Sequence, residues 1–307
     1  MKKFFQYIGY LFYRMFIFGF RITPFWLLYF ESDVISFLIF RVFKYRVKVV
    51  DKNLSLCFPE KSKEERDEIK KKYYSYMVDL FMESLKGYTY PAEKIRKHLV
   101  YDDLSIPERL YAEGKSMIVA MGHHGNWEWT TQTVKYEHKH KFCAIFKPLN
   151  NPYISNFTVR CREQRGTHFC PIEKTRFAFG MREKQPTGFC MAGDQNSTNM
   201  KRSYWVDFFG IKTACLPGIE NYAKLFDLPV IFMEIRRVKR GYYRCYVSMI
   251  VEDPSKCEKG EITQKYMSKL EEVMRNQPET WLWSHKRWKA TLLPDGTSRD
   301  SGYYDNL

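Results

Sequence analysis

The residues best suited to chemistry are a histidine and a glutamate that stand five positions apart. His123 and Glu128 belong to the run Gly-His-His-Gly-Asn-Trp-Glu at 122–128, which follows the apolar run at 116–121. A carboxylate that hydrogen-bonds one imidazole nitrogen fixes the tautomer and leaves the other nitrogen free to take a proton. Such a pair would suit the removal of a proton from a hydroxyl group that attacks a carbonyl carbon.

The spacing also restricts where this pair can lie. On a regular helix, five positions turn through about 500°, so the two side chains would point about 140° apart. They can meet only if His123 lies in a loop before a helix, a path that Gly122 and Gly125 would permit. From spacing alone, a helix-capping histidine with Glu128 on a solvated face is an alternative that stays open.

Other chemistries lack their motifs in this sequence. The His-Glu-x-x-His pattern of zinc proteases is absent, and His138 and His140 have no obvious third metal ligand. No Gly-x-Ser-x-Gly motif supports a serine nucleophile, and the segment 188–194 has no lysine after its second glycine, as a P-loop requires. The eight cysteines form no Cys-x-x-Cys pair, which favours reduced thiols in a protein that faces the cytosol.

From residue 116 onward, short apolar runs alternate with helical patterns. Buried strands are predicted at 116–121, 142–146, 188–191 and 229–233, and helices at 126–137, 153–164, 174–184 and 218–226. An edge or antiparallel strand is expected at 242–251 and a late helix at 261–276. This alternation predicts an α/β fold with a mainly parallel central sheet flanked by helices. Such sheets bind ligands at the carboxyl ends of their strands, where the run 122–128 would lie.

The first hundred residues have a helical pattern. Ser62 and Glu65 form a capping box that opens a long amphipathic helix to about Lys86. We therefore expect four parts, namely a hydrophobic membrane anchor at 1–30, a helical N-terminal region at 31–100, an α/β catalytic domain at 101–295 and a flexible tail at 296–307.

The anchor at 1–30 is apolar enough for a membrane, but Arg14 and Arg21 interrupt it. Its charge-free runs are shorter than the roughly 20 residues of a clean span. It lacks a small-residue cleavage site, so a removed signal peptide is not expected. Two interpretations stay open: a single span in which Arg14 reaches toward the headgroups, and a helix that lies in the interface with Trp26 at headgroup level.

The chain is strongly basic. Fifty Lys and Arg residues stand against 35 Asp and Glu residues, which gives a formal charge of +15. This excess favours an anionic partner, which could be nucleic acid, an acidic protein or a phospholipid surface. Composition alone does not choose among these.

The run His123-His124-Gly125-Asn126-Trp127-Glu128 resembles the His-x4-Asp/Glu box of the bacterial lipid A biosynthesis acyltransferases. These lauroyl and myristoyl transferases belong to the lysophospholipid acyltransferase-like superfamily, and the family includes mycobacterial phosphatidylinositol mannoside acyltransferases. Further segments are similar, in order, along nearly the whole chain. They are Tyr45-Arg46, Asn53-Leu54, Phe58-Pro59-Glu60, Lys147–Pro152 with Lys147 where arginine is more usual, Arg162, Arg165-Gly166, Asp194-Gln195, Phe208-Phe209-Gly210 and Trp283–Lys289.

The resemblance implies an O-acyltransferase that moves a fatty acyl chain from a thioester to a hydroxyl of a lipid A precursor without an acyl-enzyme. His123 would be the general base, oriented and charge-stabilised by Glu128. Arg162, together with backbone amides near Gly125, would stabilise the oxyanion. A surface ion pair with Glu163 or a neighbouring residue is the open alternative for Arg162.

The resemblance also implies substrate-binding residues. His124 is expected to line the pocket, and Asp194 and Gln195 to order the acceptor site or brace Arg162, with a buried structural network as the open alternative. Arg287 is expected to meet a phosphate or headgroup, with a solvated basic tail as the open alternative. The full set of expected substrate-binding residues is His124, Asn126, Lys147, Asp194, Gln195 and Arg287.

No cofactor and no metal is expected, because the acyl donor is itself a substrate, either acyl carrier protein or coenzyme A. The expected partners are acyl carrier protein, a glycolipid precursor of lipid A and an anionic membrane surface, but no nucleic acid. The expected location is the cytoplasmic face of the bacterial inner membrane. Two alternatives stay open: the same chemistry on a phosphatidylinositol mannoside, an aminolipid or a lysolipid, and a basic protein that binds lipid or nucleic acid without turnover.

Overall fold

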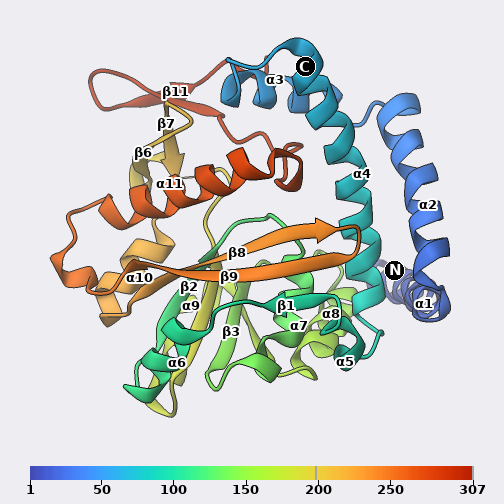
Figure 1. Cartoon of the computed structure of the whole chain (residues 1–307), viewed down its shortest axis with the longest axis horizontal. Coiled ribbons are helices and arrows are strands. Elements are labelled where there is room, and N and C mark those ends of the chain that lie inside the picture. The colour runs from blue at the N-terminus through green and yellow to red at the C-terminus, as the bar shows by residue number, and fades with distance from the viewer. Residues whose placement is uncertain (198, 306–307) are drawn as a thin grey trace.

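A seven-stranded sheet forms the centre of the protein (Figure 1). The structure is a computed structural model that describes residues 1–197 and 199–305. The strand order is β1-β9-β8-β2-β5-β3-β4, and every neighbouring pair is parallel except β8 and β9. The strands are β1 (Leu99–Tyr101), β2 (Met117–Met121), β3 (Lys141–Phe146), β4 (Thr167–Pro171), β5 (Thr187–Ala192), β8 (Val230–Lys239) and β9 (Tyr242–Val251). The predicted mainly parallel α/β sheet is confirmed.

Helices cover both faces of this sheet. Alternate residues of β2 belong to two different cores, Ile118 to one with α10 and α11, and Val119 to the other with α5, α6 and α7. This explains why β2 is buried at every position and reads as a continuous apolar run. The helices are α5 (Ala92–Ile95), α6 (Ser105–Ala112), α7 (Trp127–Glu137), α8 (Pro152–Glu163), α9 (Thr175–Ala178), α10 (Gly218–Phe226) and α11 (Glu261–Asn276).

Two small hairpins lie outside the main sheet. β6 (Tyr204–Phe208) and β7 (Ile211–Cys215) are antiparallel and are joined by Phe209 and Gly210, which both have positive φ. β10 (Ala290–Leu292) and β11 (Ser298–Asp300) form the second hairpin, of which β11 lies in the expected flexible tail. Residues 306 and 307 of that expected tail lie outside the described residues.

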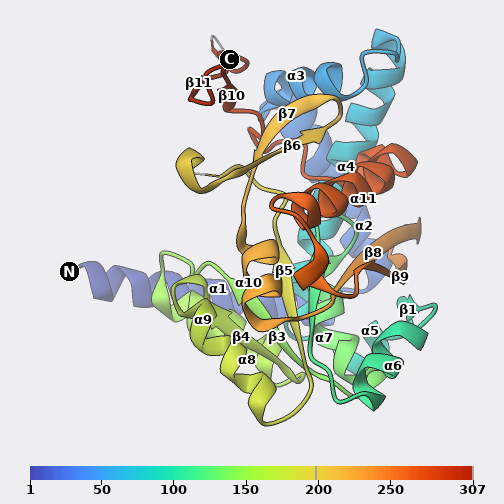
Figure 2. The ribbon, with the colours of Figure 1, turned by 90° about the vertical axis from the view of Figure 1, so that its left-hand side faces the viewer.

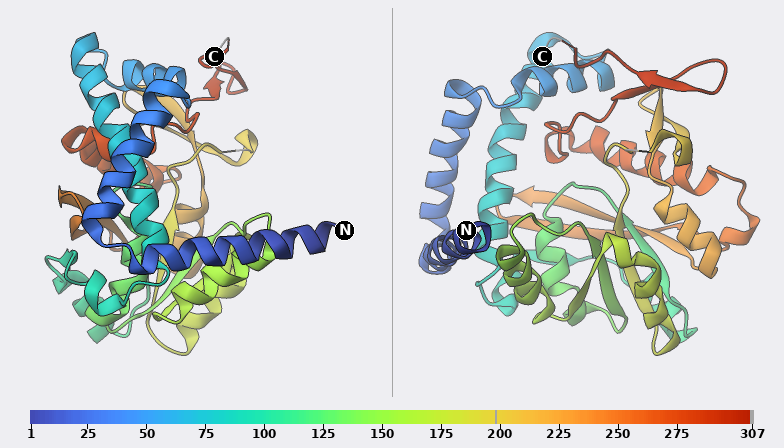
Figure 3. Two further views of the ribbon diagram at one scale, coloured as in Figure 1. Left: turned by 90° about the vertical axis from the view of Figure 1, so that its right-hand side faces the viewer. Right: turned by 180° about the vertical axis from the view of Figure 1, so that it is seen from behind.

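The N-terminal region is helical, as predicted. It consists of α1 (Lys2–Ile22), α2 (Phe25–Phe37), the π-helical segment η1 (Leu38–Val42), α3 (Val47–Cys57) and α4 (Lys63–Gly87). The capping box is confirmed, because the Ser62 hydroxyl accepts from the Glu65 amide at 3.2 Å and the Glu65 carboxylate accepts from the Ser62 amide at 2.7 Å. α2 runs beside α4, and α1 turns away from both and extends along α8 (Figure 3).

A buried polar cluster joins the N-terminal helices to the sheet. Asp79 of α4 accepts from Ser32 of α2 at 2.6 Å and pairs with two arginines at the end of β8, Arg237 and Arg240. Lys86, at the other end of α4, donates to two carbonyl oxygens where α1 ends. α4 therefore contacts both α1 and α2 and joins them to the end of β8.

α1 and α2 nevertheless leave many large apolar side chains uncovered. Those more than half exposed are Phe4, Phe5, Phe12, Met15, Phe16, Phe18, Ile22, Trp26, Phe30 and Phe37. No helix in the described part of the chain combines the length and the apolar character that the single-span interpretation of residues 1–30 requires.

We expect Asp79→Ala to destabilise the protein by about 3–5 kcal/mol, because it leaves the largely buried guanidinium of Arg237 without its partner. The free energy of unfolding from denaturant titration measures this loss. Asp207→Ala is the control, since the Asp207–Lys212 pair is exposed and its loss should change stability little. Equal effects of the two substitutions would contradict the structural role of Asp79.

Candidate active site

The sheet register brings a histidine and an aspartate together. Met121 at the end of β2 pairs with Ala192 at the end of β5, and His123 and Asp194 stand two residues beyond this pair. His123 Nδ1 lies 2.7 Å from Asp194 Oδ1, and the His123 amide donates to Asp194 Oδ2 at 2.9 Å. Trp281 Nε1 also donates to Oδ2 at 2.9 Å. Asp194 is thus fixed by three hydrogen bonds and holds both the backbone and the ring of the histidine.

This arrangement determines the tautomer of His123. An ionised carboxylate can only accept, so Nδ1 bears the proton that is shared with Asp194. Nε2 makes no hydrogen bond to the described residues, and the ring, packed edge-on against Trp127, lines a cavity. Nε2 is therefore the nitrogen available to accept a proton from a bound group.

His123 and Asp194 each stabilise the charged form of the other. Burial by itself would lower the pKa of His123, but the charge and the hydrogen bond of Asp194, with a smaller effect of Glu128, leave the pKa above its ordinary value. Burial would raise the pKa of Asp194, but the contacts with His123 and Trp281 hold it well below its usual range. His123 is consequently a stronger base than a free imidazole.

Glu128 lies in the first turn of α7 and has a different partner from the one predicted. Its carboxylate binds Arg162 of α8, with Arg162 Nε 3.0 Å from Oε2 and Nη2 2.7 Å from Oε1. The predicted hydrogen bond from Glu128 to His123 is not found among the described residues, and Asp194 takes that position instead. The reason is the parallel pairing of β2 with β5, which places Asp194 behind the imidazole, whereas α7 directs Glu128 toward α8. His123 does lie in the loop before a helix, as its spacing predicted.

Arg162 is held in place by two side chains and keeps one nitrogen free within the described part of the chain. It is largely buried, pairs with Glu128 rather than with Glu163, and donates to the Tyr88 hydroxyl at 3.0 Å. Burial would lower the pKa of Arg162, but the charge of Glu128 raises it, so the guanidinium stays fully charged. Its Nη1 makes no hydrogen bond to the described residues, and the side chain lines the cavity.

Two glycines shape the loop that holds His123. Gly125 has φ of +58°, and a Cβ atom there would lie 2.3 Å from the carbonyl oxygen of Ile235. A Cβ atom at Gly122 would lie 2.7 Å from the side chain of Leu270. Gly125 is required by its positive φ and by the backbone of β8, whereas a side chain at position 122 would displace Leu270 of α11. Both glycines agree with the predicted path.

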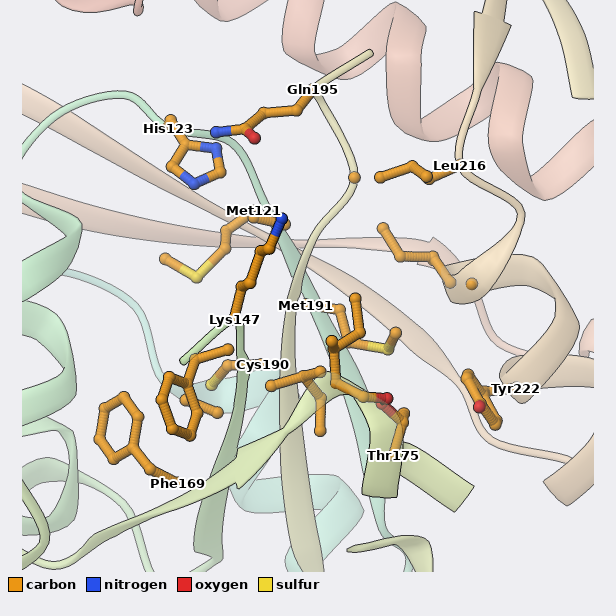
Figure 4. Close-up of a pocket in the computed structure, with 18 of the residues that line it drawn as sticks. Met121, His123, Lys147, Phe169, Thr175, Cys190, Met191, Gln195, Leu216 and Tyr222 are labelled. Atoms are coloured by element: carbon orange, nitrogen blue, oxygen red, sulfur yellow. The ribbon is translucent and has the colours of Figure 1, made fainter. Parts of the chain in front are cut away.

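His123 opens onto a cavity of about 1240 Å³, which is large for a small-molecule site. His123 and Gln195 lie at one end, Lys147 extends beside them, and Phe169, Cys190 and Met191 lie toward the other end (Figure 4). Most of the lining is apolar, which suits a long hydrocarbon chain. The basic side chains in the lining, besides Arg162, are Lys147, Arg176, Lys201, Arg202 and Lys259, and Glu128 is the acidic side chain of its described part.

Lys147 and Gln195 therefore line the cavity together with the proposed base, but His124 does not. His124 is fully buried, stacks on Phe232 and accepts from the Ile235 amide at 3.1 Å. Burial lowers its pKa to about 4, so it stays neutral. The expectation that His124 lines the pocket is wrong, because the loop turns this side chain into the core.

Asn126 and Arg287 are also buried away from the cavity lining. Asn126 caps α7, and Arg287 donates to the Ala214 carbonyl at 2.8 Å and to Cys215 Sγ at 3.0 Å. These contacts hold the hairpin β6–β7 and the helix in place. The geometry thus gives both residues structural roles in place of the expected contact with substrate.

Sequence reasoning missed Tyr88 and Trp281, which bind Arg162 and Asp194 respectively. No spacing signal marks them, because each reaches the site from a distant segment. Within residues 1–197 and 199–305, no three His, Cys, Asp or Glu side chains gather as a metal site would require.

A histidine whose Nε2 lines a large, mainly apolar cavity suits an enzyme that acts on a hydroxyl group and a fatty chain. The profile of the bacterial lipid A biosynthesis acyltransferases matches residues 2–290 of the sequence. The chain belongs to this family and is an acyltransferase. The alternative of a non-enzymatic binding protein is therefore wrong.

Several characterised proteins are similar at low identity. The chain is 24% identical over 251 residues to the lipid A biosynthesis palmitoleoyltransferase of Escherichia coli, covering 80% of each chain. It is 23% identical to a lipid A biosynthesis acyltransferase of Haemophilus influenzae, covering 75% of this chain and 72% of the other. It is 21% identical to the lipid A biosynthesis lauroyltransferase of Escherichia coli, covering 83% and 82%. The likeness extends through both the helical region and the sheet.

We expect Asp194→Asn to lower the pKa of His123, because the negative charge that raises this pKa is removed while the size of the side chain is kept. NMR titration of the His123 ring in the substituted and unsubstituted protein measures the shift. Asp207→Asn, at an exposed position, should leave the titration unchanged. An unaltered His123 pKa in Asp194→Asn would show that the carboxylate does not control the imidazole.

Proposed function

We propose that the protein transfers a fatty acyl chain from the thioester of acyl carrier protein, or of coenzyme A, to a hydroxyl of a lipid A precursor. The observation that supports this most strongly is the hydrogen bond between His123 Nδ1 and Asp194, which leaves Nε2 free at the cavity. The acceptor hydroxyl donates its hydrogen bond to Nε2, and the imidazole takes the proton as the oxygen attacks the thioester carbon. No acyl-enzyme is formed.

The tetrahedral intermediate places a negative charge on the former carbonyl oxygen. Arg162 is a largely buried cation that lines the cavity together with His123, and its Nη1, which makes no hydrogen bond to the described residues, is available to donate to this oxygen. Glu128 holds the guanidinium through two of its nitrogens and thus fixes its plane. When the carbon–sulfur bond breaks, the imidazolium returns its proton to the departing thiolate, so the base is restored.

The lining of the cavity fits both substrates. Its apolar part suits the acyl chains, and the five cationic side chains other than Arg162 suit phosphate groups of a glycolipid precursor and the acidic surface of acyl carrier protein. The formal charge of +15 would attract the same anionic partners over a longer range. This charge pattern is why we place a phosphorylated lipid, rather than a neutral one, in the acceptor site.

α1 supplies a route for lipid into the site. It lies along α8 (Figure 2). Tyr10 packs against Tyr153 and Tyr13 against Phe157, and residues of α8 line the cavity. The exposed apolar side chains of α1, together with its lysines and arginines, suit a helix that lies in the surface of an anionic bilayer. In this proposal the enzyme works at the cytoplasmic face of the bacterial inner membrane, and the acceptor enters beside α1.

We expect His123→Ala and Glu128→Ala to lower the rate of acyl transfer by about 10²- to 10⁴-fold without unfolding the protein, because the first removes the base and the second frees Arg162. The detergent-solubilised protein is incubated with acyl carrier proteins that carry chains of several lengths, and the products are identified by mass spectrometry. The acceptors offered are a lipid A precursor, a phosphatidylinositol mannoside, an aminolipid and a lysophospholipid.

His168→Ala is the matched control, since this exposed histidine of β4 pairs with Glu163 outside the cavity lining. It should keep the full rate. If both His123→Ala and Glu128→Ala transferred acyl chains at the unsubstituted rate, the assignment of the base and its arginine would be wrong. Acylation of another acceptor in preference to the lipid A precursor would overturn the proposed substrate alone.

A further inference from the structure

A second buried carboxylate lies behind the loop that holds His123 and takes no part in the proton transfer. Glu83 of α4 is fully buried and accepts three hydrogen bonds, from Asn126 Nδ2 at 2.7 Å, Tyr243 at 2.8 Å and Tyr29 at 2.9 Å. We propose that Glu83 is a positioning residue that holds the His123 loop in its reactive geometry through Asn126. This proposal rests on the proposed role of His123 as the base.

Asn126 is the link between Glu83 and the loop. Its Oδ1 accepts from the Trp129 amide at 3.0 Å and so caps α7, while its Nδ2 donates to Glu83. An amide side chain has one accepting and one donating end, and a carboxylate can only accept. Glu83 therefore admits one orientation of the Asn126 side chain, the orientation that caps the helix, and α7 begins at a fixed point after His123.

α4 holds the same segment at two further places. Tyr76, two turns before Glu83 on the same face of α4, donates to the Gly125 carbonyl at 2.6 Å, and Trp129 Nε1 donates to the Glu83 carbonyl at 3.0 Å. On the other side, Gly125 lies in close contact with Ile235 of β8. The segment 125–129 is thus held between α4 and the sheet, and His123 lies two residues before it.

Glu83 is a buried carboxylate without a paired cation in the described part of the chain, and its three hydrogen bonds explain why it is a glutamate. Burial raises the pKa of Glu83 to about 7, with a further increase from nearby Asp79, while the Tyr243 hydrogen bond lowers it. No cation pairs with it among the described ion pairs, because Arg237 and Arg240 bind Asp79. A buried carboxylate without a cation is costly, and a neutral glutamine would be less so. Glutamine has one accepting oxygen, which can serve Asn126 and Tyr243 only if the direction of the Tyr29 hydrogen bond is reversed.

The first test is Glu83→Gln, assayed for transfer from acyl carrier protein to the lipid A precursor. We expect kcat to fall about 10- to 100-fold, because small displacements of a base have effects of this size, while the KM of each substrate stays within about twofold. The acid limb of the pH profile of kcat/KM should move to lower pH. The charged groups that act on His123 are Asp194 and Glu128. His124 and His285 lie near enough to sense its charge, and Lys147 and Arg162 line the same cavity. A loosened contact with Asp194 lowers the pKa of the base.

The second test exchanges the two groups. Asn126→Asp alone sets two carboxylates against each other and should also lower kcat. In the double variant Glu83→Gln with Asn126→Asp, the new amide donates to the new carboxylate, which still caps the Trp129 amide. The hydrogen bond is restored with its polarity reversed, and we expect kcat of the double variant to exceed that of either single variant.

Glu220→Gln is the matched control. Glu220 is also fully buried and accepts three hydrogen bonds, from the Gly260 amide and from the amide and hydroxyl of Thr263, but these hold the start of α11 and not the loop. It should leave kcat and the acid limb unchanged. If Glu83→Gln does not fold, Asn126→Ser, which keeps a helix cap but is too short to reach Glu83, must show the same loss of kcat and the same shift of the acid limb.

The outcomes separate this inference from the proposed function. If His123→Ala still transfers acyl chains, the assignment of His123 as the base is wrong. If His123→Ala abolishes transfer but Glu83→Gln behaves like Glu220→Gln, the positioning role of Glu83 is wrong. It is equally wrong if the losses of the two single variants multiply in the double variant, because the two groups would then act independently.

Discussion

The hydrogen bond between His123 and Asp194 exists because β2 and β5 are parallel neighbours in register. Met121 and Ala192 end their strands side by side, so the residues two positions beyond them meet above the same edge of the sheet. The cavity lies at the same edge, since Met121, Ala192, Glu128 and Arg162 all line it. A shift of one residue in the register would turn the end of one strand to the opposite face and separate the base from its carboxylate.

The N-terminal helices are part of this arrangement rather than an appendage. One face of α4 presents Tyr76, Asp79 and Glu83, of which Tyr76 and Glu83 contact the loop after β2 and Asp79 contacts the end of β8. The same carboxylates accept hydrogen bonds from Ser32 and Tyr29 of α2. α2 is therefore held by the same face of α4 that contacts the loop of His123. The family likeness likewise extends over both regions.

Local patterns in the sequence predicted much of the fold and part of the site. Apolar runs located β2, β3, β5 and β8, and the capping box located the start of α4. His123 lies in a loop, as expected, but the contact with Glu128 on which that expectation was based is not found among the described residues. The partner of His123 was predicted wrongly, because Glu128 is near in sequence and Asp194 is not. Asp194 follows β5, which lies beside β2 in the sheet although β3 and β4 come between them in the chain. Strand order is a property of the folded sheet that local pattern does not contain. For the same reason His124 was expected at the pocket, although the Ile235 amide that holds it in the core comes from β8.

The central claim is that His123 and Asp194 act as one unit in acyl transfer. The most direct measurement is kcat for Asp194→Ala, His123→Ala and the double variant under identical conditions. If the carboxylate works only through the imidazole, the double variant should be no slower than His123→Ala, because the second loss removes nothing that remains in use. A double variant in which the two losses multiply would contradict the account, since Asp194 would then contribute to transfer without the histidine.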